Sequence, residues 1–285
     1  DEHLRNVGKE RYFVPSDKYS SSYKILKFLY RFVTADADFT IAFGRCMVHF
    51  AVDTNLVYMA SELRGYDTFF LPFNKGVSDG AGNPVNPNGL KTDYLWKETL
   101  TKESLSNIVE NYAKIIEEKD EDTGKVKRKL IFPRYHQIRA VIKLLKDAKT
   151  NGVGQKYLIQ HSAGSGKSNS ITWLAHQLVS LHNDKSENIF DSIIVVTDRR
   201  VLDKQIRETI KSFGNPKIVE AIDKTSTQLK QALKDGKKII VTTVQKFPVV
   251  FKDAGDLPNY KFAIIIDEAH SSQSGENVKE LKVSL

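Results

Sequence analysis

Residues 161–168 form a short Gly- and Ser-rich string, HSAGSGKS, that contains one lysine and ends on a hydroxyl side chain. Gly164 and Gly166 can adopt backbone conformations that turn successive N–H groups towards an anion. Lys167 adds a positive charge, and the Ser168 hydroxyl is a suitable ligand for Mg²⁺. An amphipathic segment follows directly, so the positive N-terminal end of a helix would face the same anion. This spacing predicts a site for the phosphates of a nucleotide.

A second string, DEAH at residues 267–270, follows the apolar run 262–266. A carboxylate that ends a strand beside a phosphate loop can hold a nucleotide-bound Mg²⁺, which assigns this role to Asp267. Glu268 could polarise the water that attacks the γ-phosphate. Each string has an ordinary alternative, since a Gly/Ser loop can cap a helix and acidic pairs often end strands. Together they predict an ATPase site with Lys167, Asp267 and Glu268 as catalytic residues.

The pattern of residues 130–285 predicts the strands and helices that would position these two strings. Short apolar runs alternate there with amphipathic segments; the runs are 157–160, 192–197, 217–222, 237–243 and 262–266. Apolar strands that alternate with helices are typical of a parallel sheet covered on both faces. We therefore predict an α/β, RecA-like P-loop domain over residues 130–285. Its ligands are expected at the C-terminal ends of the strands.

The first 118 residues have a different pattern, which predicts a smaller α+β region. Residues 45–73 contain three strand-like runs separated by turn residues, which indicate an antiparallel meander. The Gly-, Pro- and Asn-rich segment 74–88 predicts a long loop, and a helix is expected over residues 102–118. The charged run 119–129 is predicted to be a solvated linker in front of the α/β domain.

Composition limits the class of protein. Of the 285 residues, 40% are hydrophobic and 27% are charged, which is typical of a soluble globular protein, and no apolar run is long enough to cross a bilayer. The single cysteine, Cys46, excludes an internal disulfide and suits the cytoplasm. The net charge of +8 would attract polyanions, nucleic acid first among them. A basic surface that is merely solvated is the alternative.

With GSGKS and DEAH in this order, residues 130–285 resemble the first RecA-like domain of superfamily 2 helicases and translocases. His161 stands where the usual P-loop string begins with Gly, a position that this superfamily often relaxes. The resemblance implies ATP and Mg²⁺ as cofactors, with Ser168 and Asp267 as the metal ligands. It implies that the phosphates bind a continuous stretch of the loop, namely Gly164, Ser165, Gly166, Lys167 and Ser168.

Lesser motifs of the superfamily also find matches. Arg134 and Gln137 lie in the string RYHQ, which resembles the Arg-x-x-Gln element whose Gln binds the adenine edge. The alternative for Gln137 is the polar face of an ordinary helix. The strings TDRR and TTVQK resemble two motifs that contact the DNA sugar-phosphate backbone, which implies contacts from Thr197, Arg199, Arg200, Thr243 and Lys246. Asp198 could equally cap the helix that follows it.

A closer resemblance extends over residues 41–285. The strings VHFAVDT, FLPFNKG, GAGNP, YLWKE, LIFPRYHQ, YLIQHSAGSGKSNSI, VVTDRR and DEAHSSQSGE occur in the order found in the R (restriction and motor) subunit of type I restriction enzymes. This resemblance implies a cytoplasmic bacterial or archaeal protein that docks on methyltransferase and specificity subunits. It also implies that the subunit hydrolyses ATP and reels in double-stranded DNA. Base recognition would belong to the specificity subunit, so contacts with phosphates are expected here.

The nuclease of this family uses an acidic residue followed by Glu-x-Lys. Two strings match, Glu117–Lys119 and Glu280–Lys282, and both are expected on solvated helix faces instead. Residues 1–118 are therefore interpreted as a possible remnant of a nuclease domain, without an assigned catalytic centre. We expect no nuclease activity to be attributable to these two strings.

The family also uses a second RecA-like domain, which supplies an arginine to the ATP transition state and half of the grip on DNA. No such domain is expected in the few residues that follow the DEAH string. The chain is therefore expected to bind nucleotide but to hydrolyse it slowly. Three other readings remain: a helicase unrelated to restriction, an assembly module with an inactive ATPase site, and a small-molecule P-loop kinase.

Overall fold

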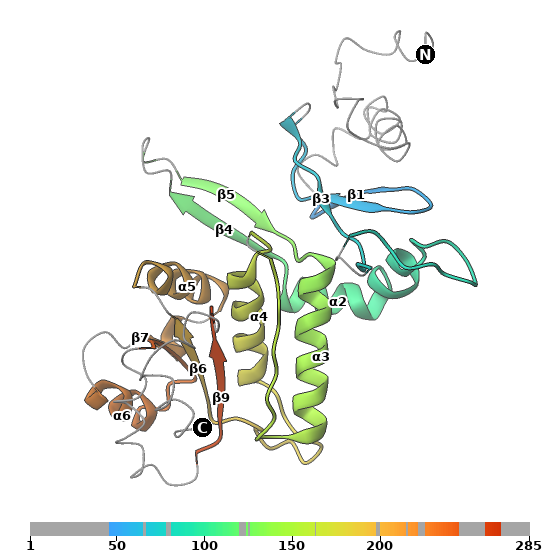
Figure 1. Ribbon diagram of the computed structural model, residues 1–285. Helices are drawn as coiled ribbons and strands as arrows, with labels where there is room; N and C mark the ends of the chain where they lie inside the picture. Colours follow the sequence, from blue (N-terminus) through green and yellow to red (C-terminus); the bar gives the residue numbers. More distant parts are fainter. Residues whose placement is uncertain are drawn as a thin grey trace, which may run out of the picture. The chain divides into compact units, whose positions relative to one another are not determined.

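A computed structural model of the chain describes residues 46–64, 67–77, 81–119, 124, 126–162, 164–197, 200–214, 216–221, 226–244 and 260–268 (Figure 1). The chain divides into two compact units, Asp1–Ile138 and Arg139–Leu285. The GSGKS and DEAH strings both belong to the second unit. No helix among the described residues has the length and apolar character that crossing a membrane requires.

Three antiparallel strands in the first unit confirm the predicted meander. They are β1 (His49–Val52), β2 (Val57–Ala60) and β3 (Leu71–Pro72), and they lie in that order in the sheet. The turn between β1 and β2 is stabilised by Asp53. Its carboxylate accepts hydrogen bonds from the backbone N–H groups of Asn55 and Leu56, at 2.6 and 2.7 Å. Such a turn is a common use of Asp, whose short side chain can bond to the backbone two residues further on.

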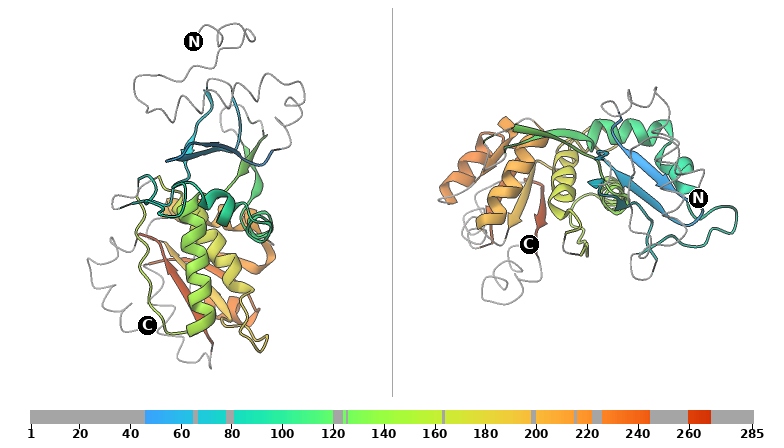
Figure 2. Two further views of the ribbon diagram at one scale, coloured as in Figure 1. Left: turned by 90° about the vertical axis from the view of Figure 1, so that its right-hand side faces the viewer. Right: turned by 90° about the horizontal axis from the view of Figure 1, so that it is seen from above.

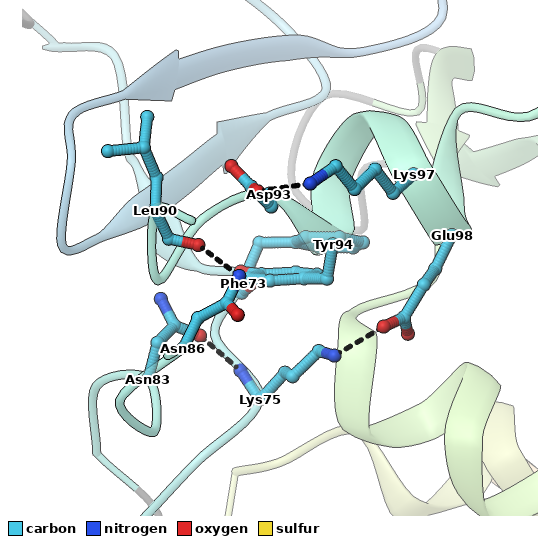
Figure 3. A network of polar contacts seen from close by, with 9 residues as sticks. All are labelled: Phe73, Lys75, Asn83, Asn86, Leu90, Asp93, Tyr94, Lys97 and Glu98. Atoms are coloured by element: carbon cyan, nitrogen blue, oxygen red, sulfur yellow. Dashed lines mark hydrogen bonds and ion pairs between the residues drawn. The ribbon is translucent and has the colours of Figure 1, made fainter. Parts of the chain in front are cut away.

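A network of polar contacts holds the long loop that follows β3 (Figure 3). The Asn83 side chain accepts a hydrogen bond from the backbone N–H of Lys75 and donates one to the backbone carbonyl of Asn55, both at 2.8 Å. The Lys75 ammonium pairs with Glu98 on a short π-helix, η4 (Leu95–Thr99). The predicted loop is thus present. The Asn residues that indicated a loop also form hydrogen bonds that stabilise it.

Tyr94 anchors the same loop in an aromatic cluster. Its hydroxyl donates to the Phe73 carbonyl at 2.6 Å, and its ring packs edge-to-face on Tyr135. Phe73 is fully buried and packs edge-to-face on both Phe50 and Tyr135. Burial raises the pKa of the Tyr94 hydroxyl well above its usual range, because the phenolate would be poorly solvated there.

The helix predicted over residues 102–118 is confirmed only in its first part, and the linker predicted over residues 119–129 is wrong where the structure describes it; residues 120–123 and 125 lie outside the described residues. Helix α2 covers only Lys102–Asn111, with the Thr101 hydroxyl as its N-cap, and two antiparallel strands follow it, β4 (Lys114–Lys119) and β5 (Val126–Ile131). Glu117 therefore lies on a strand and not on a helix, and its carboxylate pairs with Arg128 across the hairpin at 3.3 Å. Opposite charges in register across two strands stabilise a hairpin. Without that register, Glu117 had been assigned to the end of a helix and Arg128 to a solvated linker.

Four parallel strands in the second unit confirm the predicted α/β class. Their order is β7–β8–β6–β9, and their bounds are Ser192–Thr197 for β6, Val219–Ala221 for β7, Ile239–Thr243 for β8 and Phe262–Ile266 for β9. Every residue of β6 and β8 is buried, as expected for the inner strands of a sheet with covered faces. The partly exposed β9 is an end strand of the sheet among the described residues.

Two helices precede these strands in the chain, and two more connect them. Their bounds are Tyr135–Asn151 for α3, Lys167–Val179 for α4, Arg200–Phe213 for α5 and Ser226–Lys234 for α6, with a 3₁₀ turn, η5, at Pro216–Ile218. Helices α4 and α5 pack against each other and against β6 (Figure 2). The fully buried Trp173 of α4 meets Phe213 of α5 edge-to-face, with ring centroids 5.9 Å apart.

The strand predicted at Tyr157–Gln160 is absent. These residues have no regular secondary structure, and Leu158 is 85% exposed. The run is apolar but short, and none of the described strands pairs with it. The Tyr157 hydroxyl donates to Asp147 of α3 at 2.5 Å, so this segment is held by a side chain instead of a sheet ladder.

Candidate nucleotide-binding site

The phosphate loop has the backbone that its glycines predicted. Gly164 and Gly166 have φ angles of 71° and 82°, in the left-handed region that favours glycine. Gly166 caps α4, and its carbonyl accepts the first hydrogen bonds of that helix, from Asn169 and Ser170. A Cβ added at Gly164 would meet no atom within 4 Å, so open space faces the loop. The loop thus leads directly into the N-terminal end of a 13-residue helix, a position that favours an anion.

Lys167, the first residue of α4, reaches across to the DEAH string. Its ammonium donates to the Glu268 carboxylate at 2.8 Å, across 101 residues of sequence. The Lys167 and Glu268 side chains are 33% and 26% exposed, so the ion pair is partly shielded from water. The fold therefore brings the two predicted ATPase strings into direct contact.

Asp267 follows the end of β9 and is buried. Its backbone N–H donates to the Val196 carbonyl of β6 at 2.9 Å, which extends the sheet ladder to the site. Burial raises the pKa of the Asp267 carboxyl, and the neighbouring Glu268 charge acts in the same direction. Lys167 opposes this rise, so its positive charge also acts on Asp267. A bound cation would stabilise the ionised carboxylate further.

The remaining residues of the predicted phosphate loop lie in the loop itself and in the first turn of α4. Ser168 is the second residue of α4, and its carbonyl accepts a hydrogen bond from the Thr172 hydroxyl at 2.8 Å. Ser165 is buried at the turn of the loop. His161 is partly buried, and burial lowers its pKa, with the Lys167 charge acting in the same direction. His161 thus lies within the electrostatic reach of Lys167, and it favours the neutral form there.

The chemical groups of these residues are suitable for binding Mg²⁺ and a nucleoside triphosphate. The loop precedes a helix N-terminus, the Lys167 ammonium contacts Glu268 beside it, and the buried Asp267 and the hydroxyl-bearing Ser168 belong to the same two strings. Hydroxyl and carboxylate oxygens are the ligands that Mg²⁺ prefers, and backbone N–H groups are the usual partners of phosphate. Asp267 and Glu268 carry two negative charges against the one positive charge of Lys167. A bound Mg²⁺ would neutralise the excess negative charge.

The predicted adenine-binding residues belong to the first unit. Gln137 is buried in the first turn of α3, and its amide oxygen accepts a hydrogen bond from the backbone N–H of Arg134 at 2.8 Å. Arg134 is half-buried, and desolvation lowers the pKa of its guanidinium from the usual value. The structure thus defines the local geometry of both residues within their own unit, and their part in nucleotide binding stays a prediction.

The predicted DNA-contact residues are only partly described. Thr197 and Thr243 are the last residues of the adjacent strands β6 and β8, and they are paired in the sheet. Both side chains are buried. Arg200 is the first residue of α5. Arg199 and Lys246 lie outside the described residues, as do His270 and the string at Glu280–Lys282. The DNA contacts therefore stay a prediction for all five residues.

Comparison with known proteins identifies the family. The family model described as SWI2/SNF2 ATPase matches residues 136–285, which include both the phosphate loop and the DEAH string. The chain belongs to the SWI2/SNF2 ATPase family. It is therefore a helicase-like ATPase of superfamily 2, as the order of the two strings had implied.

Two further similarities accompany this family assignment. The chain is 29% identical over 170 residues to the type I restriction enzyme HindI endonuclease subunit of Haemophilus influenzae, a match that covers 56% of this chain and 16% of that protein. The chain thus corresponds to a small part of this relative. Among solved structures, it is similar to the UvsW helicase from bacteriophage T4, with a TM-score of 0.42 and 16% identity over 66% of this chain and 57% of that one. The family model and the HindI match confirm the predicted resemblance to superfamily 2 ATPases and to the R subunit.

The contact between Lys167 and Glu268 is the feature of this site that the sequence did not reveal. The GSGKS and DEAH strings assigned each residue a role towards a nucleotide, but no spacing rule connects side chains 101 positions apart. The electrostatic effect of Lys167 on His161 was likewise not predicted, because the sequence noted His161 only as a departure from the usual string. The contact between Lys167 and Glu268 depends on the parallel sheet, which brings the end of β9 next to the start of α4.

Proposed function

We propose that this SWI2/SNF2 ATPase domain binds Mg²⁺–ATP at the phosphate loop and hydrolyses it as part of a motor that moves double-stranded DNA. The observation that carries the proposal is the direct contact between Lys167 and Glu268, which unites the two strings that an ATPase needs. A helix-capping loop and an acidic strand end with unrelated roles would have no reason to meet. The similarity to the HindI endonuclease subunit supports a type I restriction complex as the setting.

Each residue has a proposed role in this chemistry. The backbone of Gly164, Ser165 and Gly166 binds phosphate oxygens, and Lys167 neutralises the outer phosphates. Ser168 and Asp267 hold Mg²⁺, which when bound supplies positive charge to the phosphates during transfer. Glu268 accepts a proton from the attacking water or orients it. The adenine edge is assigned to Arg134 and Gln137.

The contacts with DNA and with other subunits form the outer part of the proposal. Phosphates of duplex DNA are assigned to Thr197, Arg199, Arg200, Thr243 and Lys246, at or after the C-terminal ends of β6 and β8. Methyltransferase and specificity subunits are the proposed partners, by analogy with type I restriction enzymes.

The experiment that tests the nucleotide site is thermal unfolding with and without Mg²⁺–ATP, for the parent chain and for Lys167→Ala. Nucleotide at ten times its dissociation constant should stabilise the parent by about 1.4 kcal/mol, a shift of a few degrees for a domain of this size. Lys167→Ala should unfold at a similar temperature without nucleotide and lose the shift. A parent chain that shows no shift at saturating nucleotide would exclude the proposed site.

The rival readings predict different results. An assembly module with an inactive site would show no nucleotide-dependent shift while still binding partner subunits. A helicase unrelated to restriction would separate the strands of a forked duplex, whereas a duplex motor would leave them paired. DNA-stimulated hydrolysis that is lost in Asp267→Asn would support the proposed ATPase over a small-molecule kinase.

A further inference from the structure

Helix α3 carries a row of positive charge along its solvent face. The α3 row consists of Arg139, Lys143 and Lys146, which are all exposed and belong to the second unit. Spacings of four and three residues place their side chains one turn apart on the same side of a helix. Val141 and Ala148 are buried on the opposite side. The row therefore points away from the core, and α3 itself lies in front of α4 in the left view of Figure 2.

The three cations of the α3 row are not neutralised within the part of the chain that the structure describes. No hydrogen bond or ion pair engages the side chain of Arg139, Lys143 or Lys146 there. The neighbouring Lys149, in contrast, pairs with Asp184 at 3.4 Å. Like charges three or four residues apart weaken a helix, so the row by itself destabilises α3.

The carboxylate of α3 is engaged elsewhere. Asp147 is the only acidic residue in the sequence of this helix. One of its oxygens accepts a hydrogen bond from the Tyr157 hydroxyl at 2.5 Å, and the other accepts one from the Asn151 side chain at 2.9 Å. An ordinary solvated helix face mixes acidic and basic residues at helical spacing, and these residues pair. The α3 row lacks such pairs, which favours a polyanionic ligand over a face that is merely solvated.

The length of the row matches the density of charge on DNA. The helix rises about 10.5 Å over the seven residues from Arg139 to Lys146. One strand of duplex DNA carries a charge about every 3.4 Å along the axis, so it presents about three phosphates over that length. Three cations would thus meet three phosphates. An acidic protein segment has no such fixed spacing of charge, so the regular row favours DNA.

We infer that the α3 row is a second DNA-contact surface, which binds the phosphate backbone of duplex DNA without regard to sequence. The inference rests on the proposed DNA partner, but it needs none of the residues to which DNA phosphates are assigned above. Those residues lie at or after the C-terminal ends of β6 and β8, in other elements of the second unit. Contacts with phosphates release counterions, so the α3 row should contribute a salt-dependent part of the affinity.

The test is fluorescence anisotropy of a labelled duplex of random sequence, titrated with the full 285-residue chain over a range of salt concentrations. Replacement of all three row residues by Gln should reduce the slope of log K against log salt by about 2.7, at about 0.9 for each lost contact. Gln is a good helix former, so this variant should unfold at the temperature of the parent. Replacement of the exposed Lys185, Lys211 and Lys234 by Gln removes the same charge elsewhere and should leave the slope unchanged.

Two single substitutions on α3 test the direction of the row, and they serve equally if the triple variant fails to fold. Lys143→Gln should reduce the slope by about 0.9. Lys149→Gln should leave the slope unchanged, because Lys149 lies off the row and pairs with Asp184. Equal reductions in the two variants would overturn the inference, since the total charge of the helix would then matter and not the row.

The other outcomes separate the α3 row from the proposed function. An unchanged slope in the triple variant, with a reduced slope in the Arg199→Gln and Arg200→Gln double variant, would overturn the inference and leave the proposed DNA contacts in place. Tighter binding of poly-glutamate than of duplex, lost in the triple variant, would assign the row to an acidic protein segment and overturn it too. A parent chain that binds no duplex even at low salt would exclude the proposed DNA partner together with the row.

Discussion

The side-chain oxygen of Gln137 accepts a hydrogen bond from the backbone N–H of Arg134, three residues earlier, at 2.8 Å. This bond fastens the first turn of α3, and Gln137 is buried there. An amide held in this way keeps one orientation, which is what selective contact with a purine edge requires. The two residues that the Arg-x-x-Gln motif pairs by sequence are thus also paired by geometry.

Gln137→Ala should therefore reduce the preference for adenine. The ratio of the dissociation constants for GTP and ATP should fall about tenfold or more, because a buried amide that matches one base leaves the wrong base unsatisfied. Competition between ATP and GTP for the parent and the variant measures this ratio. A ratio that stays constant while both nucleotides bind more weakly would limit Gln137 to a structural role.

Replacement of Arg199 and Arg200 by Gln should weaken binding to duplex DNA without regard to sequence. Each lost phosphate contact should reduce the slope of log K against log salt by about 0.9. The double variant should therefore lose roughly 1.8 from that slope, as measured by fluorescence anisotropy over a range of salt concentrations. Replacement of the exposed residues Lys185 and Lys211 by Gln removes the same charge elsewhere and is the matched control. An equal loss in the control would contradict specific phosphate contacts.

Tyr94→Phe should destabilise the first unit by about 1 kcal/mol at neutral pH, because the Phe73 carbonyl loses its 2.6 Å partner. A pH dependence should accompany this loss. The pKa of Tyr94 is raised in the folded chain, so the folded state retains a proton that the unfolded state releases near pH 10. The stability from this group is complete below pH 10 and falls as pH rises above it.

Denaturant unfolding between pH 8 and pH 11 measures that dependence. The parent should lose stability more steeply than Tyr94→Phe over the upper part of the range, and Tyr260→Phe, at an exposed position, should follow the parent. If the free energy of unfolding depends on pH in the same way in the parent and in Tyr94→Phe, the Tyr94 hydroxyl is not the cause of the loss of stability at high pH.

Gly214→Ala should destabilise the second unit by about 1–3 kcal/mol. A Cβ at this position would lie 2.3 Å from Cε1 of His176, and that ring is held by a contact of 2.8 Å between its Nε2 and the Ile210 carbonyl. A shorter side chain at position 176 should recover part of the loss, so His176→Asn in the Gly214→Ala background is the companion variant. Urea unfolding that shows no cost for Gly214→Ala would mean that the contact between α4 and α5 relaxes freely.

The sheet of the second unit could be predicted because its strands are buried on both faces. Residues 192–197 and 239–243 have continuous apolar character, and β6 and β8 are fully buried. The two strings could be placed because each adjoins an element with a clear pattern. Residues 161–168 lead into α4, and the string at 267–270 follows β9. The buried strands and the two strings of the ATPase family could thus be predicted from local sequence alone.

The errors arose where local pattern does not determine the outcome. Residues 114–119 and 126–131 pair as antiparallel strands, with Glu117 opposite Arg128, a register that neither segment specifies by itself. The apolar run at Tyr157–Gln160 had the composition of a strand, but none of the described strands pairs with it. The contact of Lys167 with Glu268 depends on the whole sheet and could not be derived from either string.

The parallel arrangement of β6 also has a consequence for the synthesis of the chain. β6 pairs with β8 and β9, which lie later in the sequence, and Ser192 pairs with Phe262 seventy positions further on. At ribosomal rates of 5–20 residues per second, β6 would wait roughly 4–14 s for its last partner. An apolar strand is therefore exposed on the nascent chain during that interval, when chaperones and aggregation compete for it. The two strings of the proposed nucleotide site meet only after β9 has been made, so binding of nucleotide would also report that β9 has joined this sheet.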